Sequence, residues 1–237
     1  MNGSMATLRA MLDAIASVRT ENTVIICPAF TMLCANTGLD PAQLGRVTLG
    51  AQDISEHESG SYTGDVSAKM VTDTGAKYVI VGHSDRHKNH DETNETVAAK
   101  AAVAMAHGLI PIICVGESRA QKESGQTMTA IEKQVRESIP GPGARTSVHV
   151  IVAYEPLWAI STTGMGLTPT LDDIRDIHAH IAKILDEMNL GGTAILYGGS
   201  VNGRNAGRIM AIPHVDGVLV GGSSLEPNDF IPIITAK

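Results

Sequence analysis

The chain has 237 residues, of which 43% are hydrophobic and 18% are charged. This composition suits a globular protein with a sizeable core, and α/β barrels form single domains of roughly 200–250 residues. The formal net charge of -7 argues against sequence-independent nucleic-acid binding, which needs a basic surface. Aromatic residues make up only 3%, so the platforms that stack on single-stranded bases are not expected either.

The sequence also bears on location. No run approaches about 20 consecutive apolar residues, so no membrane span is expected. The N-terminus lacks a basic region followed by an apolar one, so no secretory signal is expected. The cysteines Cys27, Cys34 and Cys114 form no CxxC pair, which fits a reducing compartment. These features together predict a cytoplasmic protein.

Helical and strand patterns alternate along the chain. Residues 5–18 place apolar side chains at helical spacing, and a short β-branched run at 23–27 follows them. Further strand-like runs occur at 47–51, 77–82, 109–115, 148–154, 193–197 and 215–220. The clearest helical patterns between them are at 94–107, 127–138 and 171–189. Because the strand runs are continuously apolar, as in parallel sheets covered on both faces, we predict α/β architecture.

The count of elements suggests a barrel. No linker or shift of composition divides the chain, so residues 1–237 are predicted to form one domain. A closed parallel barrel has eight strands, each followed by a helix. The present pattern has seven strands and opens on a helix. We therefore expect a (β/α)8 barrel whose first strand is missing from this chain, with an open doubly wound sheet as the structural alternative.

Polar residues stand at the carboxyl ends of the predicted strands, where parallel barrels gather their catalytic groups. His83 follows one apolar strand, and Glu155 follows another. Desolvation there would raise the pKa of a carboxyl group and make Glu155 a useful base. The structural alternatives are a histidine bonded to backbone and a glutamate in an ion pair.

Two glycine-rich turns, at 198–200 and 221–223, each precede a helical segment. Glycine lets backbone N–H groups approach an anion, so these turns fit a phosphate site, although either could be a turn without a ligand. The sequence has no G-x-x-x-x-G-K-[ST] and no complete G-x-G-x-x-G. Pairs such as His87 and His90, or His178 and His180, lack the further ligands of a metal site, so no metal is expected.

Longer motifs resemble one known family. They read VGHSDRHKNHDETN at 81–94, CVGE at 114–117, AYEPLWAI at 153–160, YGGSVNGRNA at 197–206 and DGVLVGGSSL at 216–225. In this order they resemble the triosephosphate isomerase family, from residue 1 to about 234. The loop GSYTGDVS at 60–67 resembles that family's subunit-interface loop. The resemblance implies a cofactor-free isomerase of glycolysis and gluconeogenesis that interconverts dihydroxyacetone phosphate and glyceraldehyde 3-phosphate.

The resemblance also implies roles for single residues. Glu155 matches the general base, and His83 matches the neutral histidine that polarises the carbonyl group. Ser200, Gly221 and Gly222 match the phosphate-binding loops.

Further matches concern the surroundings of this site. Ser84 and Glu117 match positions that support the catalytic groups, and Cys114 matches the cysteine on the strand before Glu117. Thr63 matches the residue that reaches into a partner subunit, which implies a homodimer.

The chain departs from the family pattern in three places. The family reads Asn-Trp-Lys before Met-Asn-Gly, where this chain starts at Met1. Without that phosphate-binding lysine, the printed chain is expected to have weak or no activity and reduced stability. The predicted lid, residues 159–170, carries Ser161 where the family has a glycine whose N–H binds phosphate. Asp85 and Asp65 replace glutamates, and His87 replaces an arginine; the shorter Asp85 lies beside His83 in sequence.

Two other functions remain as alternatives. The altered lid would suit an isomerase of a related sugar phosphate, such as a tetrulose phosphate. The missing lysine would suit a non-catalytic descendant that keeps the fold for binding or assembly.

Overall fold

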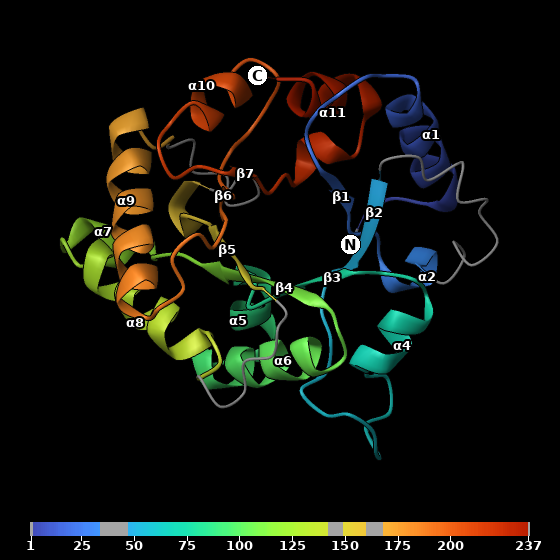
Figure 1. The fold of residues 1–237 in the computed structure, drawn as a ribbon, viewed down its shortest axis with the longest axis horizontal. Coiled ribbons are helices and arrows are strands. Elements are labelled where there is room, and N and C mark those ends of the chain that lie inside the picture. The colour runs from blue at the N-terminus through green and yellow to red at the C-terminus, as the bar shows by residue number, and fades with distance from the viewer. Residues whose placement is uncertain (1, 34–46, 142–148, 160–167, 237) are drawn as a thin grey trace.

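The computed structural model describes residues 2–33, 47–141, 149–159 and 168–236. Seven strands form one sheet, in which all neighbours are parallel (Figure 1). They are β1 (Val24–Ile26), β2 (Val47–Ala51), β3 (Tyr78–Val81), β4 (Ile110–Val115), β5 (Ile151–Tyr154), β6 (Ile195–Tyr197) and β7 (Gly217–Val218). The spatial order is the chain order, β1 to β7. A doubly wound sheet reverses its strand order at a switch point, so this order excludes that alternative.

The four helical patterns identified from the sequence are confirmed, with ends within two residues of those expected. They are α1 (Met5–Ala16), α6 (Asn94–Ala106), α8 (Thr127–Ser138) and α9 (Leu171–Glu187). Shorter helices complete the described part: α2 (Phe30–Leu33), α4 (Ala68–Asp73), α5 (Ser84–His90), α7 (Arg119–Glu123), α10 (Ala206–Met210) and α11 (Pro227–Ile234). Two 3₁₀ turns, η3 (Leu157–Ala159) and η5 (Gly222–Ser224), follow β5 and β7.

The sheet is apolar on both faces because its two faces meet different layers. In β4, Ile113 and Val115 join the large core beneath the helices, whereas Ile112 and Cys114 join a second cluster with Ile80 and Ala153. Side chains alternate across a strand, so the second cluster lies on the inner face of the curved sheet. Both faces of the sheet are therefore covered by apolar side chains, which explains the unbroken apolar runs in the sequence.

The first and last helices lie side by side (Figure 1). Leu8 and Leu12 of α1 share a buried cluster with Phe230 and Ile234 of α11. The Thr20 hydroxyl donates a hydrogen bond of 2.5 Å to the carbonyl oxygen of Ile234. The helices thus continue around the sheet from one end to the other, which is the architecture of a parallel α/β barrel.

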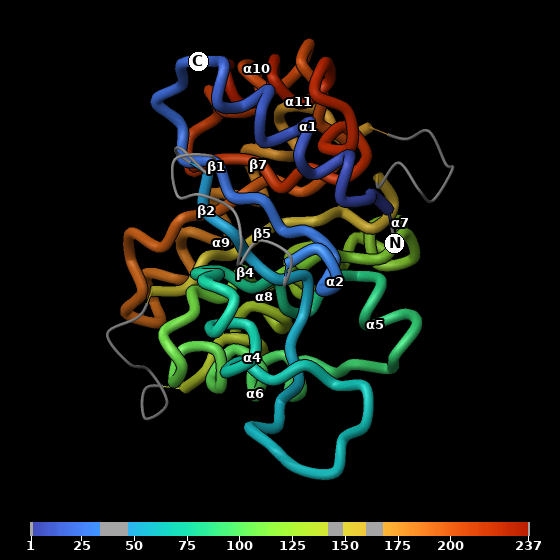
Figure 2. The backbone as a smooth tube through the Cα atoms, turned by 90° about the vertical axis from the view of Figure 1, so that its right-hand side faces the viewer, coloured from blue at the N-terminus to red at the C-terminus, as the bar shows by residue number. Residues whose placement is uncertain are grey.

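One loop projects from this body. The residues between β2 and α4 extend away from the helices and strands (Figure 2). Gly60 and Gly64 both have positive φ, at 136° and 100°, which glycine adopts readily. Among the described residues, no helix is both long enough and apolar enough to cross a membrane.

Candidate active site

The structure brings His83 and Glu155 together at the carboxyl ends of their strands. His83 is the N-cap of α5, just after β3, and Glu155 follows β5 directly. The His83 Nε2 atom lies 2.9 Å from Glu155 Oε1. Glu155 is only 5% exposed, so its carboxylate is held largely out of water. A buried carboxylate beside an imidazole can exchange a proton with a ligand while the ring donates a hydrogen bond.

Backbone groups of α5 orient this pair. The Asp85 N–H donates to His83 Nδ1 at 3.1 Å, and the Ser84 N–H donates to Glu155 Oε2 at 3.3 Å. An N–H can donate to Nδ1 only while that nitrogen is unprotonated, so the proton of the neutral ring sits on Nε2, which faces Glu155. Burial acts to lower the pKa of His83, but the hydrogen bond and charge of Glu155 outweigh it, and the net pKa is raised.

Glu117 supports the segment that follows Glu155. Its side chain is fully buried, and its Oε1 accepts hydrogen bonds from Trp158 Nε1 at 2.8 Å and from the Tyr154 hydroxyl at 3.3 Å. Burial and the nearby Glu117 carboxylate raise the pKa of Tyr154, so this phenol stays protonated and donates. Glu117 therefore fixes residues on both sides of Glu155.

Cys114 lies in β4 on the inner face of the sheet. Complete burial raises the pKa of its thiol well above the ordinary value, and the charge of Glu155 acts in the same direction. A thiol in this state is a packing group rather than a nucleophile. Cys114 thus stands on the strand before Glu117, and the charge of Glu155 reaches it.

Three of the four residues predicted to bind phosphate, all except Ser161, lie in the last two strand-to-helix turns. Ser200 follows β6, is half-buried and lines a cavity of about 270 Å³. Gly221 and Gly222 follow β7, and η5 begins at Gly222. A Cβ atom built on either glycine would meet nothing within 4 Å, so their backbone faces open space. The turns therefore leave room for an anion to approach backbone N–H groups.

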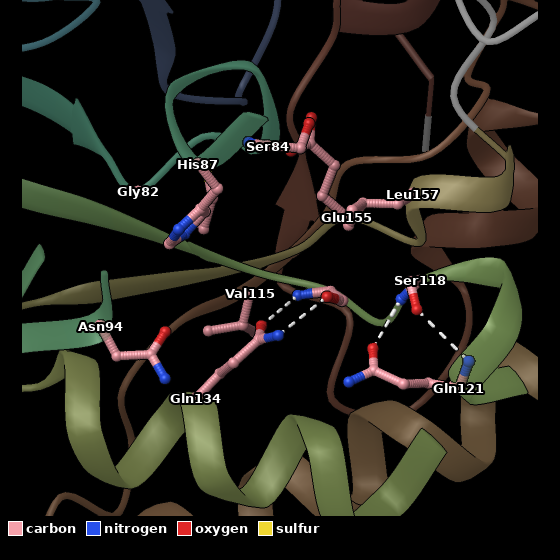
Figure 3. Close-up of a pocket in the computed structure, with 12 residues that line it drawn as sticks. Gly82, Ser84, His87, Asn94, Val115, Ser118, Gln121, Gln134, Glu155 and Leu157 are labelled. Atoms are coloured by element: carbon pink, nitrogen blue, oxygen red, sulfur yellow. Dashed lines mark hydrogen bonds between the residues drawn. The ribbon is translucent and has the colours of Figure 1, made fainter. Parts of the chain in front are cut away.

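A second cavity of about 240 Å³ adjoins the carboxylate (Figure 3). Glu155 and Ser84 line one part of it, and Asn94 and Gln134 line another. The dashed lines at Gln134 in Figure 3 join its side chain to the backbone that follows Val115. This wall is made of amide groups from helices α6 and α8, which the sequence did not single out.

The remaining predicted residues lie away from this pair or beside it. Asp85 is exposed, and its Oδ2 lies 3.8 Å from His83 Nδ1. Thr63 is exposed on the projecting loop, next to Tyr62, whose ring stacks on His57 with centroids 3.9 Å apart. Ser161 and most of the predicted lid fall within 160–167, outside the described residues.

A network of ion pairs near α5 was not predicted from the sequence. Lys100 Nζ lies 2.5 Å from Glu92 Oε1 and 2.8 Å from Asp53 Oδ1. Arg86 Nη2 bonds to the same two carboxylates, at 2.7 Å and 2.9 Å. This network joins the loop after β2 to α5 and α6. Charged residues are usually solvated, so nothing in the sequence indicated that Lys100 and Glu92 are buried and that Asp53 and Arg86 are partly buried.

A search for metal ligands among the described residues finds no group of three or more His, Cys, Asp or Glu side chains that could hold an ion. The structure places one buried carboxylate, one imidazole and two open glycine-rich turns at the strand ends of a parallel α/β barrel. Such a site defines a class of barrel enzymes that move a proton on a small anionic substrate.

Comparison with known proteins identifies the family. The family model for triosephosphate isomerase matches residues 1–237. A triosephosphate isomerase from Ruegeria pomeroyi is 44% identical over 242 residues, covering 100% of this chain and 93% of the relative. One from Chelativorans sp. is 45% identical over 216 residues, covering 90% and 82%. The crystal structure of triosephosphate isomerase from Bartonella henselae superposes with a TM-score of 0.84 at 33% identity, covering 98% and 93%. The chain belongs to the triosephosphate isomerase family and is an isomerase.

Proposed function

We propose that this protein interconverts dihydroxyacetone phosphate and D-glyceraldehyde 3-phosphate through an enediolate, with Glu155 as base and His83 as electrophile. The observation that carries the proposal is the 2.9 Å contact between His83 Nε2 and Glu155 Oε1 at the carboxyl ends of β3 and β5. Both groups needed for proton transfer next to a carbonyl are then in one place.

The proposed reaction moves one proton between adjacent carbons. Glu155 takes the proton from C1 of the ketose and returns a proton to C2 of the enediolate, while the hydroxyl proton on O1 passes to O2, so no net proton is gained or lost. The Nε2–H of His83 donates to the oxygen on which negative charge develops. Because Nδ1 accepts from the Asp85 N–H, the neutral ring presents its proton to the substrate side.

The phosphate is proposed to bind at Ser200, Gly221 and Gly222, with the Ser161 N–H as a further donor. The open backbone at both glycines supports this assignment. Fixing the dianion orients the reacting carbons against Glu155, which is where much of the rate acceleration of such enzymes arises. Ser84, Asp85, Cys114 and Glu117 are proposed to keep the catalytic pair in place.

The test is a coupled assay in both directions with the triose phosphates, and with a tetrulose phosphate for comparison, of a version of the chain that is extended before Met1 by an apolar strand ending in Asn-Trp-Lys. We expect turnover of the C3 substrates that exceeds turnover of the C4 substrate. No turnover of either triose phosphate would overturn the proposal. A preference for the C4 substrate would support the related-sugar alternative, and tight binding of a phosphate-bearing enediolate analogue by the folded 237-residue chain would contradict a non-catalytic descendant.

We further propose that residues 1–237 act as one domain of a cytoplasmic homodimer. The projecting loop with exposed Thr63 and 45%-exposed Tyr62 supports the dimer, since such a loop can insert into a second copy. Light scattering after size-exclusion chromatography should give twice the chain mass, and Thr63→Arg should shift it toward one chain. A wild-type protein that stays at the mass of one chain would contradict the dimer.

A further inference from the structure

Gln134 makes an unusual contact for a side chain on a surface helix. Its Oε1 accepts from the Gly116 N–H at 2.7 Å, and its Nε2 donates to the Gly116 carbonyl oxygen at 3.0 Å. Both backbone polar groups of one residue are thus paired by one amide, as in a strand ladder. Figure 3 shows the Gln134 side chain reaching from α8 to this backbone.

Gly116 in turn lies directly against the backbone of Glu155. A Cβ atom built on Gly116 would stand 1.8 Å from the Glu155 carbonyl oxygen and 2.9 Å from Leu157 Cδ1. There is no space between these two segments, so a shift of Gly116 must displace the chain at Glu155. Interiors packed this closely transmit small displacements rather than absorbing them.

Hydrogen bonds on either side of Gly116 tie the same two segments together. The Glu155 N–H donates to the Val115 carbonyl at 2.7 Å, and the Leu157 N–H donates to the Glu117 carbonyl at 3.2 Å. The backbone of 115–117 therefore holds the backbone of 155–157 at both ends, while Gln134 holds its middle residue from the other side.

The helix that carries Gln134 is itself fixed. Ile131 and Val135, on the same turn of α8, are fully buried in the core under the sheet, and α8 packs against β4. The amide is thus anchored on a rigid element rather than on a loop, which is the arrangement that sets a functional group accurately.

From this geometry we propose that Gln134 is a positioning residue for the isomerase reaction: it sets the place of the Glu155 carboxylate through Gly116. The inference rests on the proposed role of Glu155 as the base. The side-chain amide of Gln134 touches no reacting group, yet it determines how accurately the Glu155 carboxylate is positioned.

The test compares Gln134→Met with Gln126→Met. Methionine keeps the unbranched stem and helix preference of glutamine but removes both polar atoms. Gln126 is an exposed N-cap of the same helix, and its side chain makes no cap hydrogen bond, so it is a matched control. Gln134→Glu retains the acceptor for the Gly116 N–H but replaces the donor by a carboxylate oxygen that faces the Gly116 carbonyl. The readouts are kcat and KM for the triose phosphates, and amide hydrogen exchange.

We expect Gln134→Met to lower kcat roughly ten- to a hundredfold with KM within about twofold of wild type, because a misplaced base slows chemistry more than binding. Gln134→Glu should lower kcat at least as far, because its second oxygen repels the Gly116 carbonyl. Exchange should accelerate at the amides of Gly116, Glu155 and Leu157 and stay unchanged at the buried Ile181 of α9. Gln126→Met should match wild type throughout.

Several outcomes would overturn the inference. They are an unchanged kcat in Gln134→Met, a parallel loss of kcat and stability with faster exchange over the whole chain, or failure of both Gln134 variants to fold. If wild type does not turn over triose phosphates, that result counts against the proposed function and not against the Gln134 contact. Amide hydrogen exchange then tests the inference on its own. Local acceleration at Glu155 would then support the contact path, and its absence would overturn it.

Discussion

His83 and Glu155 end different strands, yet their Nε2 and Oε1 atoms lie 2.9 Å apart. The contact holds a carboxylate with 5% exposure against an imidazole whose other nitrogen accepts from backbone. A hydrogen-bond acceptor that can take a proton and a donor that can stabilise an oxyanion are thus adjacent before any substrate binds. Preorganisation of this kind removes reorganisation from the chemical step.

Replacing the proposed base should separate activity from stability. Glu155→Gln keeps the shape but removes the basic oxygen, so kcat should fall about 10²–10⁴-fold. Thermal melting should show an unchanged or higher Tm, because a buried carboxylate has become a neutral amide. Glu123→Gln, in an exposed pair with Arg119, serves as the control and should retain activity. A loss below tenfold in Glu155→Gln would remove this residue from the reaction.

Lys100 should matter far more to folding than a surface lysine. Its side chain is 5% exposed and bridges Glu92 and Asp53, so Lys100→Met removes one of the two cations that hold these carboxylates and leaves Arg86 as the other. Breaking such a buried network costs about 3–5 kcal/mol. Lys69→Met, whose partner Asp73 is equally exposed, should change the unfolding free energy by less than about 1 kcal/mol. Urea titration measures both, and equal effects would contradict a structural role for the network.

His178 should make the protein acid-sensitive. It is fully buried, its Nδ1–H donates to the His214 carbonyl at 2.9 Å, and burial lowers its pKa in the folded state. The unfolded chain takes up a proton near pH 6.5 that the folded chain does not bind. The contribution of neutral His178 to the free energy of unfolding is therefore complete above that pH. It is lost as the pH falls, by at most about 1.4 kcal/mol per pH unit.

The measurement is urea unfolding of wild type and His178→Gln between pH 7.5 and 5. The stability advantage of wild type over the variant should shrink as pH falls, since glutamine does not titrate. An advantage that stays constant or grows toward pH 5 would show that the histidine is not held neutral.

Trp158 offers a direct optical probe, since it is the single tryptophan of the chain. Lys122 Nζ lies 4.3 Å from its ring centroid and 3.3 Å from Asp173 Oδ1. Lys122→Met should shift the emission of Trp158 and lower stability by about 0.5–1 kcal/mol, because the cation over the ring is gone. Lys183→Met, at an exposed position on α9, should leave the spectrum unchanged. Identical spectra for wild type and Lys122→Met would show that the contact does not form in solution.

Much of the architecture could be predicted from the sequence because its signals are local and repeated. Unbroken apolar runs marked the strands, and the 3.6-residue period marked α1 and α9. The helix α5, Ser84–His90, has no buried residue. It therefore has no periodic pattern of apolar residues by which the sequence could predict it. Tertiary position, rather than local preference, determines such a helix.

The predicted site divides in the same way. His83 and Glu155 could be paired because parallel strands of a barrel end on one rim. Gln134 and Lys100 could not, since a glutamine or lysine in a helix usually faces water, and only the spatial partner reveals otherwise. Contacts between a helix and a distant strand end leave no spacing rule in the sequence.

The hydrogen bond from Thr20 to the Ile234 carbonyl spans 214 positions along the chain. During synthesis, α1 leaves the ribosome long before α11 exists. Until then Leu8 and Leu12 cannot pack against Phe230 and Ile234. Contacts of such long sequence separation form late and slow folding. The nascent N-terminal helix therefore keeps part of its apolar face exposed until synthesis ends, and transiently exposed apolar surface of this kind favours aggregation.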